Sequence, residues 1–285
     1  MTPEQYCQNK AANSGSSFYY SFLFLPPEQR RAITAVYAFC REVDDVVDEC
    51  RDAGMARIKL TWWREEIARV FAGEPQHPVG QALAPAVREF SLAQEYFQEI
   101  IDGMEMDLEP VRYASFKDLA LYCYRVASVV GLLSAEIFGY QDRHTLKYAH
   151  DLGMAFQLTN ILRDVGEDAQ RGRVYLPEDE MAAHGVTAED LHKGELTDAL
   201  RALLALQARR ARQYYEQAFA KLPERDRFAQ RSGLIMAAVY MTLLDRIEGE
   251  GYPVLTRRVR LSPWRKLWIA WRTARREAVR HDRCV

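Results

Sequence analysis

The spacing of the apolar residues constrains this chain more than any other feature of its sequence. Along almost the whole chain, apolar residues recur at intervals of three and four, which places them on one face of an α-helix. The stretch over residues 33–47 is an example, and it follows Pro26-Pro27-Glu28, a sequence that favours the start of a helix. Almost no stretch alternates with the period of two that a half-buried strand requires. The pattern predicts an all-α protein without a β-sheet domain.

The same pattern divides the chain into helices separated by short breaks. Helices are expected over residues 28–47, 59–71, 84–90, 93–108, 115–140, 142–168, 196–221 and 228–249. A capping box at Thr187–Asp190 predicts one more short helix, and residues 172–185 are expected to form a loop. No linker rich in Pro, Gly or Ser divides the chain, so residues 1–285 are expected to form a single domain. Helices with this much apolar surface must enclose a large core or a large cavity.

Composition excludes several classes of protein. Hydrophobic residues make up 48% and charged residues 27% of the chain, which excludes global disorder. The net charge of −2 argues against a general nucleic-acid binder. The five cysteines are scattered without a CxxC pair, and the N-terminus lacks a signal-peptide pattern. The longest apolar run, Val126–Ala135, is shorter than a membrane helix needs. We therefore expect a cytoplasmic protein with reduced cysteines.

Two acidic clusters carry the strongest chemical signal. In the first, Asp44 and Asp48 are four residues apart, so both carboxylates project from one face of the predicted helix. In the second, Asn160, Asp164 and Asp168 repeat the same spacing among apolar neighbours. Like charges at this spacing destabilise an isolated helix, and a bound cation would compensate for them. Because Mg²⁺ prefers oxygen ligands and substrate phosphates, two such stripes predict a site for a diphosphate held through Mg²⁺.

Simpler interpretations and other chemistries explain the two stripes less well. A single DDxxD stripe is usually a solvated helix face, but the second stripe lies on an otherwise apolar helix and needs polar partners there. A helical di-iron site requires a pair of ExxH motifs on helices, and Glu189–His192 is the one ExxH motif that falls in a predicted helix. No GxGxxG, GxxxxGK[ST] or GxSxG motif is present, so nicotinamide, P-loop and hydrolase chemistry have no local signature.

Five segments in order along the chain resemble the squalene/phytoene synthase family. These segments are Ser16-Ser17-Phe18-Tyr19-Tyr20, Tyr37 to Asp48, Tyr122-Cys123-Tyr124-Arg125-Val126-Ala127, Gln157 to Asp168, and Arg173-Val174-Tyr175-Leu176-Pro177. The resemblance covers residues 14–260 and implies an all-α isoprenoid synthase fold, with helices around a large central cavity. It also implies Mg²⁺-dependent chemistry on two allylic prenyl diphosphates.

The resemblance assigns roles to particular residues. Asp44, Asp48, Asn160, Asp164 and Asp168 would hold Mg²⁺, and their four aspartates would be catalytic together with Tyr122, which matches a tyrosine near the reacting carbons. The residues that would contact the diphosphates or order their site are Tyr37, Arg41, Gln157, Asn160, Arg163, Arg173 and Tyr240. Ser14, Ser16 and Ser17 are further candidates, although some relatives have a lysine in this segment. An ordinary helix cap explains these serines equally well.

Within the family, the two N-terminal segments are most similar to the presqualene diphosphate synthases of the bacterial hopanoid pathway. The implied reaction joins two farnesyl diphosphates head to head into presqualene diphosphate and releases diphosphate. Separate downstream enzymes of the squalene pathway would then be partners. Phytoene synthase and dehydrosqualene or squalene synthase share the motifs and are the alternatives, and a non-catalytic, membrane-associated helical scaffold is an alternative of another class. The sequence leaves the base open between Tyr122 and the released diphosphate.

The last segment of the chain differs from the rest in charge. Residues 257–285 contain ten Lys or Arg against two acidic residues, a net charge of +8. Trp264, Trp268 and Trp271 are spaced by four and three, so they lie on one helical face. A basic helix with aromatic side chains suits peripheral contact with the inner face of the membrane. Alternatively, the tryptophans pack on the domain and the arginines are solvated, with Arg257 or Arg258 reaching the diphosphates.

Overall fold

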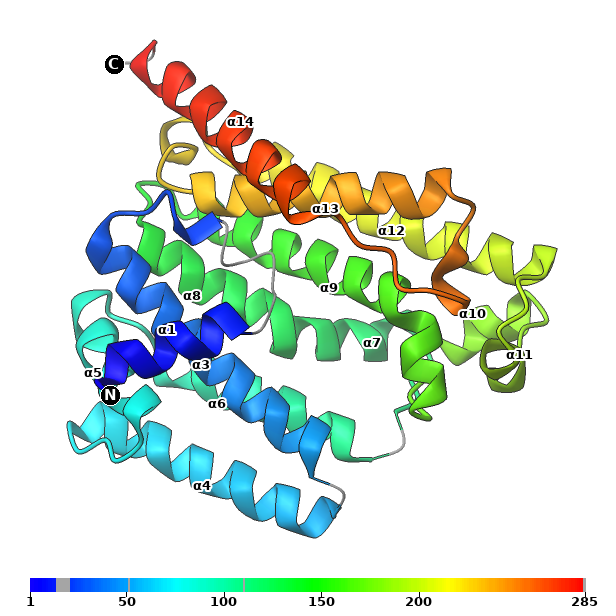
Figure 1. Cartoon of the computed structure of the whole chain (residues 1–285), viewed down its shortest axis with the longest axis horizontal. Helices are drawn as coiled ribbons and strands as arrows, with labels where there is room; N and C mark the ends of the chain where they lie inside the picture. Colours follow the sequence, from blue (N-terminus) through cyan, green and yellow to red (C-terminus); the bar gives the residue numbers. More distant parts are fainter. Residues whose placement is uncertain (14–20, 51, 110, 284–285) are drawn as a thin grey trace.

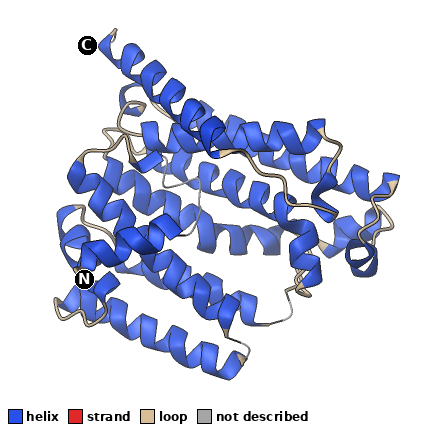
Figure 2. Cartoon of the chain, viewed as in Figure 1, coloured by secondary structure: helices blue, strands red, loops and turns tan. Residues whose placement is uncertain are grey.

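The computed structural model describes residues 1–13, 21–50, 52–109 and 111–283, and within these ranges it contains helices and no strands (Figure 2). The all-α prediction is confirmed. The helices are α1 (Pro3–Asn13), α3 (Pro27–Glu49), α4 (Ala53–Ala72), α5 (Pro78–Glu89), α6 (Gln94–Glu105), α7 (Phe116–Cys123), α8 (Val129–Phe138), α9 (His144–Gln170), α10 (Glu178–Ala183), α11 (Ala188–Lys193), α12 (Asp198–Lys221), α13 (Arg231–Gly249) and α14 (Pro263–Asp282). Short 3-10 or π turns are η1 (Met106–Leu108), η2 (Tyr124–Ser128), η3 (Glu224–Asp226) and η4 (Pro253–Leu255).

Two hydrophobic clusters meet at α8. One cluster is built on α3, α4, α5 and α6, and it includes Val129 and Leu133 of α8. The other is built on α9, α12 and α13, and it includes Leu132 and Ala135 from the opposite side of α8. In Figure 1, α8 and α9 run through the middle of the bundle between these two halves. The acidic stripe of α9 therefore lies on a central helix, and that of α3 lies on a helix that packs against α8.

Glycines allow the central helices to approach closely. A Cβ atom on Gly131 of α8 would lie 2.5 Å from the carbonyl oxygen of Ala149, and one on Gly153 of α9 would lie 2.5 Å from the Cα of Ser128. Both distances are well below van der Waals contact, so larger residues would push α9 away from α8 and η2. These two glycines therefore form the contact between the backbones of the central helices.

The turn η2 interrupts the helix that leads into α8. Over Tyr124–Ser128 the backbone forms a π-helix, and the amide of Val129 donates to the carbonyl oxygen of Tyr124, five residues earlier. Single π turns of this kind occur mostly at functional sites. Val126 and Ala127 within the turn, and Val130, Gly131 and Ser134 after it, all line the same cavity.

The segment Phe116–Phe138, which combines α7, η2 and α8, is long and apolar enough to cross a membrane by length and composition. The sequence expectation counted only Val126–Ala135 and was too short, because the helix continues through the π turn. Half of the most apolar window of this segment is buried inside the bundle. Its α8 portion packs against both α3 and α9. These contacts describe a central core helix.

Two local expectations are corrected by the structure. The predicted loop over 172–185 contains α10, because Glu178, Asp179 and Glu180 follow Pro177 in the first turn and Met181 is buried. The N-terminal helix α1 was not predicted, and it packs on α3 and α5. The capping box of Thr187 and Asp190 is confirmed at the start of α11. The helix boundaries elsewhere agree to within a few residues except for α4 and α5, which begin about six residues before the predicted ranges.

Candidate active site

The first acidic stripe lies on α3, where each carboxylate is paired with an arginine. Arg41 donates to Asp44 at 2.5 Å and to Asp45 at 2.6 Å. Buried Ile33, Val36 and Val43 hold α3 in the core, while Asp44 and Asp48 remain about one-third exposed. Burial raises the pKa of Asp44 to about 6, although the positive charge of Arg41 opposes the shift.

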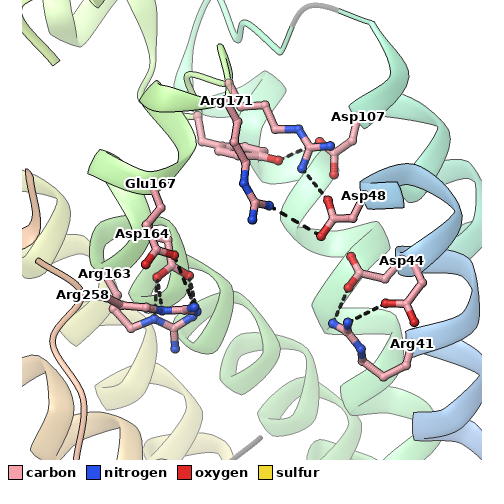
Figure 3. A network of polar contacts seen from close by, with 12 residues as sticks. Arg41, Asp44, Asp48, Asp107, Arg163, Asp164, Glu167, Arg171 and Arg258 are labelled. Atoms are coloured by element: carbon pink, nitrogen blue, oxygen red, sulfur yellow. Dashed lines mark hydrogen bonds and ion pairs between the residues drawn. The ribbon is translucent and has the colours of Figure 1, made fainter. Parts of the chain in front are cut away.

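The loop after α9 crosses to this stripe. Arg173 donates to Asp48 at 2.8 Å, and Arg171 lies 3.7 Å from the other oxygen of the same carboxylate (Figure 3). Gly172 between the two arginines has a φ of +75°, a conformation that side chains disfavour. The charge of Arg173 also acts on Asp44 and Asp168. Arg173 therefore connects the two acidic stripes electrostatically.

The second stripe lies on α9, which is buried along most of its length. Asp164 accepts from Arg163 at 2.8 Å and from Arg258, whose Nε lies 2.9 Å away. Arg258 also lies 3.3 Å from Glu167. Tyr240 of α13 is hydrogen-bonded to Arg163. In Figure 3 this group faces the Asp44 and Asp48 group across the site. Of the two arginines considered in the tail, Arg258 reaches the site.

Two groups on α9 lack the partners that their burial requires. Asn160 donates to Gln157 at 3.3 Å, but its buried Oδ1 has no hydrogen-bond partner among the described residues. Burial and the neighbouring charge of Asp164 raise the pKa of Asp168 to about 7. An amide oxygen without a partner and a carboxylate that resists ionisation are both satisfied by a hard cation. The donor set therefore fits Mg²⁺.

No preformed metal centre exists within the described ranges, since no three His, Cys, Asp or Glu side chains converge on one point. The oxygen donors are instead divided between α3 and α9, and arginines neutralise Asp44, Asp48 and Asp164. Such a divided arrangement suits a cation that binds together with an anionic substrate, because the substrate supplies the missing ligands.

Asp107 is a site residue that the sequence analysis missed. Its carboxylate accepts hydrogen bonds from Tyr122 and from Tyr175, both at 2.9 Å. Burial raises the pKa of Asp107 to about 6, against the effect of both hydrogen bonds. Burial also raises the pKa of Tyr122 well above its ordinary value. No sequence pattern indicates a role for Asp107, because an isolated acid near the end of a helix is typical of a surface position.

An apolar cavity of about 170 Å³ lies between α3, η2, α8, α9 and α13. Tyr37, Gln157 and Asn160 are among the residues that line it, so the cavity touches the polar site. Its remaining walls are mostly apolar, and they include Val130, Phe156 and Met236. At α9, the cavity extends from Asn160 to Tyr148.

The structure brings most of the predicted site residues together. Arg41, Asp44, Asp48 and Arg173 form one group, and Arg163, Asp164 and Tyr240 form the other. Tyr37, Gln157 and Asn160 line the cavity between them, whereas Tyr122 contacts Asp107. Asp168 lies among the charges of Asp164, Arg171, Arg173 and Asp107. Ser14, Ser16 and Ser17 lie outside the described residues.

An all-α bundle with two acidic helices beside an apolar cavity is the architecture of the isoprenoid synthases. The family model of the squalene/phytoene synthases matches residues 11–265 of the chain. The chain belongs to the squalene/phytoene synthase family.

Individual relatives agree with this assignment. The chain is 37% identical to a 15-cis-phytoene synthase of Synechococcus elongatus over 92% of its own length and 89% of the relative. It is 38% identical to a phytoene synthase of Narcissus pseudonarcissus, of which it spans 63%. Among solved structures, a dehydrosqualene synthase superposes with a TM-score of 0.83 at 30% identity, covering 95% of both chains. A squalene synthase from Alicyclobacillus acidocaldarius has a TM-score of 0.79 at 29% identity, covering 88% and 94%.

Proposed function

We propose that this protein condenses two farnesyl diphosphates head to head into presqualene diphosphate. The observation that carries the proposal is the junction of two arginine-paired acidic stripes with one apolar cavity. In the reaction, the bond between C1 and oxygen of one substrate breaks, and its electron pair leaves with the diphosphate. The C2–C3 double bond of the second substrate attacks the resulting allylic cation. Loss of one proton then closes the cyclopropane ring.

The arginines and acids of the site would divide the work of this ionisation. Arg41, Arg163, Arg173 and Arg258 are placed to attract the diphosphates, exchanging carboxylate partners for phosphate oxygens. Asp44, Asp48, Asn160, Asp164 and Asp168 would hold Mg²⁺. When bound, Mg²⁺ supplies positive charge that stabilises the leaving diphosphate. An apolar cavity protects the cation from water, which would convert it to an alcohol.

The pair of Asp107 and Tyr122 bears on the proton step. The raised pKa of Tyr122 means that the phenol keeps its proton at neutral pH, so it serves as a hydrogen-bond donor. Asp107 holds that phenol in place. The base in this proposal is therefore the released diphosphate, with Tyr122 positioned near the reacting carbons.

The far end of the cavity supports a C15 substrate. Tyr148 and Asn160 lie on the same helix, and a rise of 1.5 Å per residue puts about 18 Å between them. Phe138 and Gln230 line the cavity together with Tyr148, and Gln230 donates to the carbonyl oxygen of Gly139 at 2.9 Å. The bulk of the Tyr148 ring at this end would exclude one further isoprene unit.

Phytoene synthesis is the second candidate, because the relatives that match at 37–38% identity are phytoene synthases. Product analysis separates the two candidates. The purified protein is incubated with Mg²⁺ and either C15 or C20 prenyl diphosphate, with and without NADPH, and products are identified by mass spectrometry. We expect presqualene diphosphate from the C15 substrate, unchanged by NADPH. A C40 product would favour phytoene synthesis, squalene would favour a one-step enzyme, and no Mg²⁺-dependent release of diphosphate would favour a scaffold.

Substitutions at Tyr148 test the chain-length argument separately. Tyr148→Ala should raise turnover of the C20 substrate relative to the C15 substrate at least tenfold, because it removes the ring at the closed end. Tyr148→Phe is the matched control, since it keeps the ring and should leave the ratio unchanged. An unchanged ratio in Tyr148→Ala would contradict the role of Tyr148 without affecting the proposed reaction.

A further inference from the structure

Helix α14 presents a tryptophan face to solvent. Trp264, Trp268 and Trp271 are 81%, 54% and 51% exposed, and they share one side of the helix. Exposed Leu267 and Val279 extend the same side. We define these five residues, with Arg272 and Arg275, as the α14 face. The expectation that the tryptophans pack on the domain is wrong, because the opposite side of α14 makes that contact.

The buried side of α14 fixes the helix to the bundle. Ile269, Ala270, Thr273 and Glu277 are buried against the body of the protein, where α14 packs along α13. The buried carboxylate of Glu277 pairs with Arg227 at 3.1 Å. The ring of His281 stacks on Phe228 with centroids 4.4 Å apart. The α14 face is therefore a rigid, outward surface that needs no refolding to bind (Figure 1).

The cations of this helix are arranged around the tryptophans. The guanidinium of Arg272 lies 5.1 Å from the ring centre of Trp268, and that of Arg275 lies 5.5 Å from that of Trp271. Within the described part of the chain, Arg265, Arg272, Arg275 and Arg283 have no carboxylate within 4 Å, whereas many arginines of other helices are paired. Indole rings with unpaired cations beside them match the interfacial region of an anionic lipid bilayer.

We infer that the α14 face docks the protein on the surface of an anionic lipid bilayer. The tryptophans would enter the headgroup region, and the arginines would contact lipid phosphates. This occupant is favoured by charge complementarity and by the three exposed indole rings along one side of the helix. A bilayer accepts such a side along its whole length. The inference rests on α14 alone and does not depend on the reaction catalysed.

Vesicle co-sedimentation of the full chain tests the inference. The vesicles contain phosphatidylcholine alone or phosphatidylcholine with phosphatidylglycerol, at low and at high salt. We expect binding to the anionic vesicles only, weakened by salt because screening shortens the range of the attraction. Arg272→Gln with Arg275→Gln should lower the partition coefficient about thirtyfold, since two interfacial cations are lost. Trp264→Ser, Trp268→Ser and Trp271→Ser combined should lower it at least tenfold.

Matched variants control for charge and exposed apolar surface elsewhere. Arg31→Gln with Arg88→Gln removes two exposed cations, and Met55→Ser with Ile58→Ser removes two exposed apolar side chains of α4. Both controls should bind as the wild type does. Equal binding of all variants, or equal binding to neutral vesicles at high salt, would overturn the inference. A second copy of the chain and a DNA duplex are the other occupants to test. The inference would also be overturned if the wild type bound no vesicles and the α14 variants lost self-association or DNA binding.

Discussion

The acidic stripes of α3 and α9 have the same spacing but different surroundings. On α3, Asp44 and Asp48 are about one-third exposed, and each has an arginine partner. On α9, Asp164 is only 17% exposed and is paired with two arginines. The Oδ1 atom of Asn160 has no hydrogen-bond partner among the described residues, and burial with the charge of Asp164 disfavours the ionised form of Asp168. The stripe of α3 is thus neutralised within the protein, whereas that of α9 still requires a cation or a proton. The same sequence pattern can therefore carry different energetic costs in one site.

Substitution of one acid in each stripe should give the largest effects. We expect Asp48→Asn and Asp164→Asn each to lower activity more than a hundredfold, because each removes a ligand charge. Their stabilities should differ. Asp164→Asn should cost about 1–3 kcal/mol, since Arg163 and Arg258 lose their partner, and Asp48→Asn less than about 1 kcal/mol.

Diphosphate release and urea denaturation measure these two quantities, with circular dichroism to confirm the helical content. More than a tenth of wild-type activity in either variant would contradict the role of both stripes. Equal losses of stability in the two variants would contradict the difference between them.

Asp107 should give an intermediate effect, because it acts on the site through Tyr122. Asp107→Asn is expected to lower activity about tenfold, since the amide still contacts Tyr122 but loses the negative charge. Tyr175→Phe removes the other hydrogen bond to Asp107 and serves as the comparison. Steady-state kinetics should show a lower kcat with little change in KM. Unchanged kcat in Asp107→Asn would show that this acid only supports packing.

The pH dependence of stability should separate the two stripes. Folded Asp44 and Asp168 have pKa values of about 6 and about 7, above the ordinary 3.8, so folding favours their protonated forms. Their contribution to stability is therefore fully present below about pH 3.8 and is lost as the pH rises from there to the folded pKa, about 6 for Asp44 and about 7 for Asp168. Thermal unfolding without Mg²⁺ should show this loss, and Mg²⁺ should reduce it.

Substitution of each aspartate shows which carboxyl causes which part of the loss of stability with pH. Asp168→Asn should remove the loss of Tm near pH 7, and Asp44→Asn the loss near pH 6. If the metal-free protein were equally stable from pH 5 to pH 8, the two carboxyls would not have these raised pKa values.

The smallest effect is expected at the other end of the cavity. The buried hydroxyl of Tyr148, like the Oδ1 atom of Asn160, has no hydrogen-bond partner among the described residues. Tyr148→Phe should stabilise the protein by about 1 kcal/mol, because an unsatisfied buried hydroxyl is removed. Asn160→Ala should instead lower Mg²⁺-dependent activity. Urea denaturation of Tyr148→Phe is the measurement, and a loss of stability would indicate a partner for the hydroxyl.

Local patterns predicted the fold and both stripes, because helical periodicity and i, i+4 spacing are properties of neighbouring residues. Contacts between distant parts of the chain could not be predicted in this way. Arg258 reaches Asp164 from 94 residues away, and Tyr122 and Tyr175 meet on Asp107 only after folding. The exposure of the α14 tryptophans depended on which side of the helix meets α13. Sequence patterns identified the acidic side chains of the candidate site, and the fold determined their partners.

The π turn at Tyr124–Ser128 has a consequence for how this protein can change in evolution. Its extra residue sets the rotation of everything that follows in α8. If the same residues instead formed an ordinary α-helix, with none removed, α8 would turn by about 100° relative to α7. Val130, Gly131 and Ser134 would then leave the cavity together, and Gly131 would leave Ala149. Point substitutions can remodel the cavity gradually, whereas a change that abolished the π turn would remove one of its walls in a single step.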